Sequence, residues 1–186
     1  MPFPNQTDRQ SIIETAAALI EAEGANQLSL GKLAQAVGVK APSLYRHVKN
    51  KDEVLNLVTM LTFSRLFKRY DAAIDTASGS PIDQCLELAL THRAFAIETP
   101  NLYMLAFSRK RPDLEPDDDM LLAEAIKLQQ IVTLFAGEEN SLIALRGLLA
   151  LIHGFVSLEI NEQYRRGGDL EETFSSAVRS YLVGWC

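Results

Sequence analysis

The 186-residue sequence predicts an all-α protein of about nine helices arranged in two helical subdomains. Apolar residues recur at helical spacing along most of the chain, and the alternation that is typical of strands is almost absent. Glycine and proline are sparse and fall mostly between these periodic stretches, where they separate one helix from the next. Hydrophobic residues make up 47% and charged residues 23%, which indicates a globular chain and excludes a disordered one.

The first two helices have clear start and stop signals. The first is expected over about residues 7–23, because Gly24 suits the position just after a helix end. Ser29 can cap the second helix through its hydroxyl oxygen, and Gly38 ends that helix after about two turns.

The third and fourth helices follow the turn at Gly38. Pro42 falls in the first turn of a short third helix, where a missing N–H costs little. Asn50 opens the fourth helix and forms a capping-box-like pair with Glu53. This helix is expected to continue to about residue 76, so the boundary between the subdomains falls inside it.

Five further helices follow the break at residues 78–81, which read Ser-Gly-Ser-Pro. The first of them stops before Pro100, since the residue before a proline disfavours helical geometry. Residues 109–116 are expected to be a loop, and the three aspartates at 117–119 complement the positive end of the next helix. Asp169 and Glu172 form another capping-box-like pair. The expected helices span about residues 82–98, 101–107, 117–135, 141–166 and 170–184.

The formal net charge of −6 hides a segregation of charge along the chain. Residues 1–56 contain six basic and six acidic groups, so the remainder carries the whole −6. Residues 31–51 contain five basic residues and no acid. Such a run can be a solvated helical face, but it also creates a local positive field that would attract a polyanion.

A low cysteine count and the lack of recognisable targeting signals predict a cytoplasmic protein with no membrane association. The two cysteines, Cys85 and Cys186, are too few for a disulfide scaffold. The N-terminus lacks the basic and apolar regions of a signal peptide. The sequence has no run of 18 apolar residues, so no transmembrane helix is predicted.

Residues 29–51 read SLGKLAQAVGVKAPSLYRHVKNK and predict a helix-turn-helix. Two short helices are joined by a tight turn, and the second is free to lie in the major groove of DNA. Residues 40–43 stand at the start of this second helix, where contacts with base edges concentrate. Phenol, imidazole and ammonium groups follow, and each can donate a hydrogen bond to a phosphate oxygen.

From about residue 9 to residue 58 the chain resembles the DNA-binding domain of the TetR (tetracycline-repressor) family. The resemblance implies that the tyrosine, histidine and last lysine of LYRHVKNK contact phosphates and that residues 41–43 and the arginine contact or adjoin bases. Gly31 stands where the family's namesake has a base-reading arginine, so the operator does not carry over. The predicted DNA-binding residues are Ser29, Lys40, Ala41, Pro42, Ser43, Tyr45, Arg46, His47 and Lys51.

Three of these residues have an alternative structural explanation. Tyr45 could pack on the first helix, Pro42 could only stiffen the turn, and Arg46 could simply be exposed to solvent.

The resemblance implies that residues 1–55 bind DNA and that residues 56–186 bind a small-molecule effector and form a homodimer. Residues 142–160 are apolar nearly all round, which predicts a helix buried on more than one side. Residues 153–159 also resemble a subgroup named WHG for its Trp, His and Gly, although this chain lacks the Trp. The predicted dimer-interface residues are Leu145, Leu149, Ile152, Val156, Phe174, Val178 and Tyr181.

Aromatic residues and histidines of the second domain are candidates for the effector pocket, with burial in the core as the alternative for each. Arg93 and Glu98 either face a pocket or form ion pairs. No catalytic residue, metal site or cofactor is predicted, because the chain shows no nucleophile–base or metal-ligand spacing. The predicted pocket residues are Phe63, His92, Phe95, Tyr103, Phe107 and His153.

Together, these observations predict a ligand-responsive transcriptional regulator that is not an enzyme. It is expected to repress by binding a pseudo-palindromic, double-stranded operator as a homodimer, and to be released by a small-molecule effector. The alternatives are a transcriptional activator and a DNA-binding protein that needs no ligand. A small helical enzyme would require converging acid, base or nucleophile groups, and none is evident.

Overall fold

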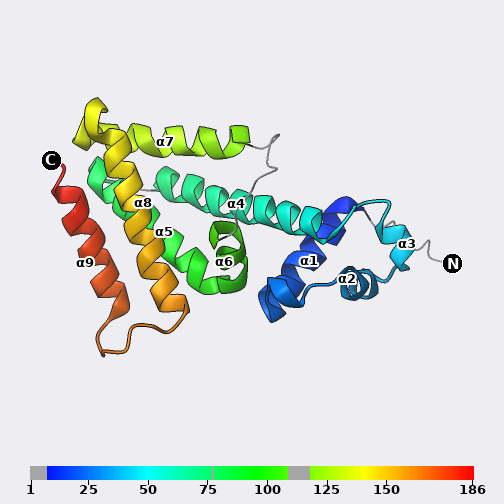
Figure 1. The fold of residues 1–186 in the computed structure, drawn as a ribbon. Coiled ribbons are helices and arrows are strands. Elements are labelled where there is room, and N and C mark those ends of the chain that lie inside the picture. The colour runs from blue at the N-terminus through cyan, green and yellow to red at the C-terminus, as the bar shows by residue number, and fades with distance from the viewer. Residues whose placement is uncertain (1–7, 77, 109–117) are drawn as a thin grey trace. The chain divides into compact units, whose positions relative to one another are not determined.

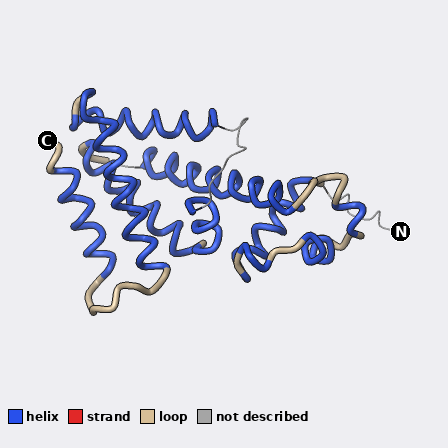
Figure 2. Tube along the Cα trace, in the orientation of Figure 1, coloured by secondary structure: helices blue, strands red, loops and turns tan. Residues whose placement is uncertain are grey.

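The computed structural model describes residues 8–76, 78–108 and 118–186, and within these ranges all regular secondary structure is helical (Figures 1 and 2). Nine α-helices and one short 3₁₀ helix are present in this part of the chain, which confirms the predicted fold class. The helices divide into two compact units. The described part of unit 1 comprises residues 8–64 and 99–108, and that of unit 2 comprises residues 65–76, 78–98 and 118–186.

Unit 1 contains the predicted helix-turn-helix and a core built mainly from its short helices. Ile12 and Ile20 from the first helix, and Leu33 from the second, are fully buried there. The elements of this unit are α1 (Arg9–Glu23), the 3₁₀ helix η1 (Ala25–Gln27), α2 (Leu30–Val37), α3 (Ala41–Leu44), the first half of α4 (Lys51–Thr76) and α6 (Pro100–Ser108).

The helix ends in unit 1 follow the local capping signals. Asp8 accepts a hydrogen bond from the Ser11 amide at 2.7 Å and begins α1. Gly24 ends α1 with a positive φ of 85°. The Ser29 hydroxyl accepts from the Lys32 amide at 3.2 Å, which confirms its predicted role as the cap of α2.

The start of α4 differs in detail from the predicted capping box. Asn50 Oδ1 accepts from the Glu53 amide at 2.8 Å, as expected. The Glu53 carboxylate accepts from the Lys49 amide at 2.6 Å instead of returning to Asn50. Glu53 also pairs with Arg9 of α1 at 2.9 Å, so this one side chain ties the loop before α4 to the first helix.

Helix α6 packs within unit 1, although its sequence neighbours belong to unit 2. The Glu21 carboxylate of α1 accepts from the Asn101 and Leu102 amides at 3.4 and 3.0 Å. Asn101 Nδ2 donates in return to the Glu21 carbonyl at 2.8 Å. The first turn of α6 is thus capped by a residue 80 positions earlier in the chain. The prediction that DNA binding and regulation divide after residue 55 stays a prediction.

Unit 2 is a bundle of the second half of α4 with α5 (Pro81–Glu98), α7 (Asp118–Ala136), α8 (Glu138–Ile160) and α9 (Leu170–Val183). Helix α8 begins about three residues earlier than predicted, after Gly137 with its φ of 75°. It also ends earlier, because Asn161 caps it by donating to the Ser157 carbonyl at 2.7 Å, and Glu162 then adopts a positive φ of 52°.

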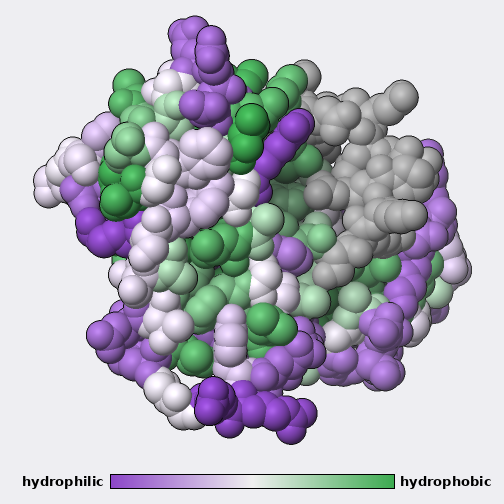
Figure 3. Space-filling model, turned by 60° about the vertical axis from the view of Figure 1, so that its left-hand side comes forward, coloured by the Kyte–Doolittle hydropathy of each residue, from purple (hydrophilic) through white to green (hydrophobic). Residues whose placement is uncertain are grey.

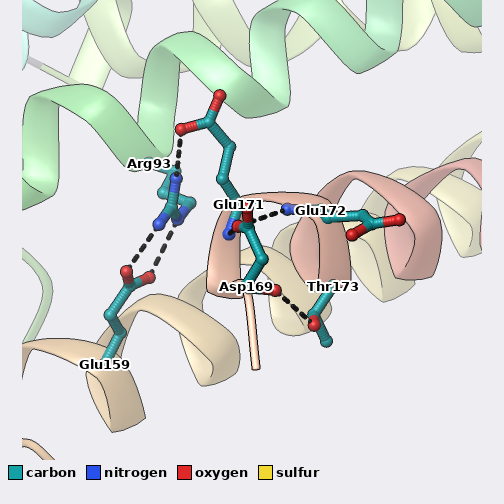
Figure 4. Close-up of polar contacts among 6 residues, drawn as sticks. All are labelled: Arg93, Glu159, Asp169, Glu171, Glu172 and Thr173. Carbon is teal, nitrogen blue, oxygen red and sulfur yellow. Dashed lines mark hydrogen bonds and ion pairs between the residues drawn. The ribbon is translucent and has the colours of Figure 1, made fainter. Parts of the chain in front are cut away.

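The start of α9 confirms its predicted cap. Asp169 Oδ1 accepts from the amides of Glu171 and Glu172 at 2.8 and 3.1 Å (Figure 4). The predicted loop at 109–116 and the aspartate at 117 lie outside the described residues, as do the side chains at 118 and 119.

Helix α8 is long and apolar enough to cross a membrane by length and composition alone. The core helix of a globular domain meets the same criteria, and α8 packs against α5, α7 and α9 of its own unit. It therefore provides only weak evidence for a membrane span.

Candidate nucleic-acid interface and internal cavity

The turn between α2 and α3 has the geometry of a helix-turn-helix. Gly38 adopts the left-handed conformation with φ 78° and ψ 26°. The following Val39 amide donates to the Ala34 carbonyl at 2.9 Å, which closes the end of α2. Leu44 of α3 and Val48 are buried in the core of unit 1. The remaining side chains of α3 are therefore turned outward.

Most of the predicted DNA-binding residues lie on the surface of this motif. Tyr45 is 56% exposed, which argues against the alternative that it packs in the core. Its phenol is available to a partner beside α3. Ser29, Lys40, Ala41, Pro42 and Arg46 are also exposed, whereas Ser43, His47 and Lys51 are half-buried.

The positive charge of this surface is only partly neutralised. Lys32 pairs with Glu23 at 2.7 Å, which removes one of the five basic residues from the field. Within the described ranges no carboxylate pairs with Lys40, Arg46 or Lys49. The predicted DNA-binding residues did not include Lys49. Its position within residues 31–51, which contain no acidic residue, was the sequence signal that indicated it.

Lys51 occupies a defined position at the start of α4. Its Nζ donates to the Asn26 carbonyl at 3.2 Å. An ammonium group has three donors, so this bond leaves two for a phosphate oxygen. The bond to Asn26 holds the ammonium group at the edge of the motif.

The predicted pocket residues do not form one site, because they divide between the two units. Phe63, Tyr103 and Phe107 form an aromatic cluster within unit 1, with ring centroids 5.1 Å apart for Phe63 and Phe107 and 4.5 Å for Tyr103 and Phe107. Phe63 and Tyr103 are buried, which fits the alternative explanation that these residues belong to the core and do not line a pocket. Phe95, His92 and His153 belong to unit 2.

The two histidines of unit 2 lie on facing helices and both remain uncharged at neutral pH. His92 Nδ1 is 2.5 Å from the Tyr70 hydroxyl. Burial, with a smaller contribution from His153, lowers the pKa of His92 to about 3. Burial also lowers the pKa of His153, whose Nε2 is 3.4 Å from the Ser157 hydroxyl. Neither imidazole therefore provides a cation for an anionic ligand.

Unit 2 encloses a small apolar cavity of about 20 Å³ between α4, α5, α7 and α8. Tyr70 and Cys85 bring a hydroxyl and a thiol to its wall, and burial raises the pKa of the thiol to about 12. None of the six predicted pocket residues is among those that line it. Three residues predicted for the dimer interface line it instead, namely Leu145, Leu149 and Ile152.

Five of the seven predicted dimer-interface residues are buried inside the subunit: Leu145, Ile152, Val156, Phe174 and Val178. Their packing leaves little surface for a partner to contact. The exposed apolar surface of α8 comprises Leu149, which belongs to the predicted set, together with Leu142, Ile143 and Leu158; these four are 37–59% exposed. Tyr181 is half-buried, and its hydroxyl donates to the Ala144 carbonyl at 2.9 Å. Figure 3 shows hydrophobic patches between hydrophilic ones on one face of the protein.

Arg93 connects three helices of unit 2 (Figure 4). Its guanidinium donates to both carboxylate oxygens of Glu159 at 2.6 and 2.9 Å, and lies 3.7 Å from Glu171 at the start of α9. Arg93 and Glu159 are only 12% and 13% exposed. The bond to Glu159 raises the pKa of Arg93. Arg93 therefore forms an ion pair, one of the two predicted roles, and this pair is mostly buried. Glu98 also forms an ion pair, with Arg69 at 2.6 Å on the surface.

Among the described residues, no group of three or more His, Cys, Asp or Glu side chains could hold a metal ion.

The two parts of the chain match two family models. Residues 12–58 match the model described as bacterial regulatory proteins, tetR family. Residues 85–181 match the model described as tetracyclin repressor-like, C-terminal domain. The second description names no subgroup, so the likeness to WHG proteins stays a prediction.

Curated proteins are similar to this chain over lengths that range from its first third to nearly the whole chain. An uncharacterized HTH-type transcriptional regulator of Bacillus subtilis, YobS, is 28% identical over 179 residues, which cover 95% of this chain and 91% of that protein. Tetracycline repressor class D of Escherichia coli is 38% identical over 58 residues, or 31% of this chain and 27% of that protein.

Two solved structures show the same fold. A protein of unknown function from Rhodococcus sp. RHA1 superposes with a TM-score of 0.85 at 19% identity, covering 99% of both chains. A TetR variant from Acinetobacter baumannii AYE, in complex with minocycline, superposes with a TM-score of 0.71 at 21% identity, covering 96% of both. With a helix-turn-helix in unit 1 and a family model that matches more than half of its length, the chain belongs to the TetR family of DNA-binding transcriptional regulators.

Proposed function

We propose that this chain is a ligand-responsive repressor that binds a pseudo-palindromic operator as a homodimer and is released by a small-molecule effector. The observation that carries the DNA-binding part is the outward surface of the helix-turn-helix. It presents Lys40, Arg46 and Lys49 without carboxylate partners among the described residues. The segment after residue 56 carries the net charge of −6 and would repel DNA from its surface.

The homodimer is supported by the apolar surface that α8 leaves exposed in a single subunit. Ile143 and Leu158 are 59% and 40% exposed there. Several exposed apolar side chains on one helix are what an interaction surface would require. A two-fold dimer would present two helix-turn-helix motifs to a two-fold operator, which is why the operator is proposed to be pseudo-palindromic.

Release by an effector follows from differential affinity. A ligand that binds better to a conformation with the wrong spacing of the two motifs lowers operator affinity by that difference. As a regulator of this kind, the protein would act in the cytoplasm, and it would bind its effector without converting it.

Selection from random double-stranded DNA tests the DNA-binding proposal. The full chain is expected to enrich one pseudo-palindromic sequence, and to bind it with two chains per duplex. Enrichment of no sequence would contradict the proposal, and enrichment of a single half-site bound by one chain would contradict the dimer.

A reporter gene placed behind the selected sequence then tests the regulatory sign. Expression of the protein is expected to lower the reporter signal, and an increase would identify an activator.

A further inference from the structure

Glu53, in the first turn of α4, is a carboxylate next to the basic residues of the helix-turn-helix. Its Oε2 accepts a hydrogen bond from the Lys49 amide at 2.6 Å, and its Oε1 pairs with Arg9 of α1 at 2.9 Å. The Glu53 amide in turn donates to Asn50 Oδ1 at 2.8 Å. Glu53 is therefore bonded to two consecutive residues of the α3–α4 connection, residues 45–50.

The bond to Glu53 continues the main-chain hydrogen bonds of this connection. The amides of His47 and Val48 donate to the Leu44 carbonyl at 2.9 and 3.1 Å, and the Val48 side chain is buried in the core of unit 1. The next amide, that of Lys49, donates to the Glu53 carboxylate. This carboxylate takes the place of the main-chain acceptor that a continuing helix would supply, so it sets where the backbone leaves the core.

The two acceptor bonds of Glu53 have different consequences. The ion pair with Arg9 joins side chains that are 26% and 54% exposed, and exposed pairs of this kind contribute little to stability. The bond to the Lys49 amide is charge-assisted, which makes it stronger than a neutral hydrogen bond. It also acts on the main chain directly, so its loss would release the backbone of Lys49.

The Lys49 side chain extends from this fixed backbone into solvent. It is exposed, and no carboxylate among the described residues pairs with it. It lies in the sequence between His47 and Lys51, which are both predicted to contact phosphates. Lys51 is itself held by the Asn26 carbonyl at 3.2 Å. A cation whose backbone is already ordered loses less freedom when it meets a phosphate.

We propose that Lys49 contacts a DNA phosphate and that Glu53 is the positioning residue that places it. Glu53 acts through the Lys49 amide and does not itself touch DNA. This inference rests on the DNA-binding part of the proposed function and deepens it by these two residues. The positioning role has an unexpected sign, because removal of a carboxylate close to a polyanion should by charge alone raise the affinity.

Glu53→Ala tests this sign by fluorescence-anisotropy titration of the full chain with the selected duplex and with a duplex of random sequence. Affinity for both is expected to fall at least about tenfold, because the released backbone of Lys49 must be ordered again when DNA binds. The matched control is Asp52→Ala, which removes an exposed carboxylate from the same turn and should leave affinity unchanged or raise it. Unchanged or higher affinity in the Glu53→Ala variant, or equal losses in both variants, would overturn the proposal.

Glu53→Gln tests whether the bond to the Lys49 amide carries the effect. The amide oxygen of glutamine can still accept from this N–H, although the charge is lost. Affinity is therefore expected to stay within about threefold of that of the unsubstituted chain. A loss as large as that of Glu53→Ala would mean that the bond does not carry the effect, and would overturn the role of Glu53.

A double-mutant cycle with Lys49→Ala separates positioning from general destabilisation. Lys49→Ala alone is expected to lower the slope of log affinity against log salt by about one, and an unchanged slope would exclude the phosphate contact. In the Lys49→Ala background, Glu53→Ala should cost less than about threefold, since no ammonium group remains to be placed. Equal losses with and without Lys49 would indicate a merely structural role and overturn the proposal.

Melting curves establish that each variant is folded at the temperature of the titrations. If Glu53→Ala is unfolded there, Glu53→Asp replaces it in the cycle with the same expected pattern, because the shorter side chain keeps the charge but withdraws the acceptor from the Lys49 amide. An unsubstituted chain that binds neither duplex would refute the proposed function. Binding by the unsubstituted chain without the expected pattern in the variants would refute this inference alone.

Discussion

At the scale of single residues, the clearest consequence of burial is the neutral state of His92. The imidazole lies 2.5 Å from the Tyr70 hydroxyl, is 2% exposed, and titrates with a pKa of about 3 in place of 6.5. A proton therefore binds the unfolded chain between these two values but not the folded one. Burial is the main cause of this lowered pKa, because it penalises the charged imidazolium.

Acidification below pH 6.5 is accordingly expected to destabilise the protein. The stability that His92 contributes is complete above its unfolded pKa of 6.5 and falls by about 1.4 kcal/mol per pH unit as the pH drops toward 3. Urea unfolding at neutral pH and at a pH about one unit below 6.5 measures the slope. His92→Gln, which does not titrate, should reduce this dependence, and an unchanged slope would mean that another group is responsible.

Lys51 provides the second prediction at this scale. Lys51→Ala is expected to weaken binding to all duplexes and to lower the slope of log affinity against log salt by about one, because one phosphate contact is lost. DNA titrations at several salt concentrations measure the slope. Lys68→Ala is the matched control, since Lys68 is an exposed lysine of the same helix in unit 2. A normal slope in the Lys51→Ala variant would exclude Lys51 from the phosphate contacts.

At the scale of elements, the contact between α8 and α9 depends on a glycine. The Tyr181 hydroxyl reaches the Ala144 carbonyl by passing over Gly147, where a Cβ would overlap the hydroxyl oxygen. Gly154, two turns further along α8, has nothing within 4 Å of the same position. Gly147 therefore has no room for a side chain, whereas Gly154 does.

Gly147→Ala is expected to destabilise the protein by about 1–3 kcal/mol, because Tyr181 must leave its site and lose its hydrogen bond. Gly154→Ala should instead stabilise it by up to about 1 kcal/mol through helix propensity. Chemical denaturation of both variants measures the difference. Tyr181→Phe combined with Gly147→Ala should recover part of the loss, and equal effects of the two alanines would refute the close contact.

At the scale of the whole molecule, the exposed side of α8 is the surface through which the proposed dimer would form. Ile143→Glu is expected to weaken the proposed dimer more than about a hundredfold. Each copy loses at least about 1.5 kcal/mol of apolar burial, and a two-fold interface contains the residue twice. Sedimentation at several protein concentrations measures the association.

The control for this variant is Leu122→Glu on α7, which removes a leucine of similar exposure, 58%. Its association constant should match that of the unsubstituted chain. A dimer that survives Ile143→Glu but not Leu122→Glu would place the interface on α7.

Local signals in the sequence predicted the parts of the molecule that depend on neighbouring residues. The cap of α2 at Ser29, the turn at Gly38 and the cap of α9 at Asp169 are confirmed. Each involves atoms within about four positions of one another, where the residue type alone sets the available hydrogen bonds. The helix-turn-helix, with no acidic residue between positions 31 and 51, is likewise set by residues that are close together in the sequence.

The predicted interior was less accurate, because an apolar residue at helical spacing does not reveal which neighbour it meets. Val156 and Phe174 were expected at a subunit interface and lie in the core of one subunit. Phe63 and Phe95 were expected in one pocket and belong to different units. Periodicity identifies a buried face of a helix but not the partner that covers it.

The sequence by itself therefore determined the fold class, the caps at Ser29 and Asp169, the DNA-binding motif and the family. Only the tertiary structure decided that α6 packs in unit 1 against Glu21, that Arg93 joins three helices, and that Tyr181 lies against Gly147. The physical reason is distance along the chain. Caps and turns are short-range hydrogen bonds, whereas these three features arise from the packing of helices that are far apart in sequence, which no local pattern encodes.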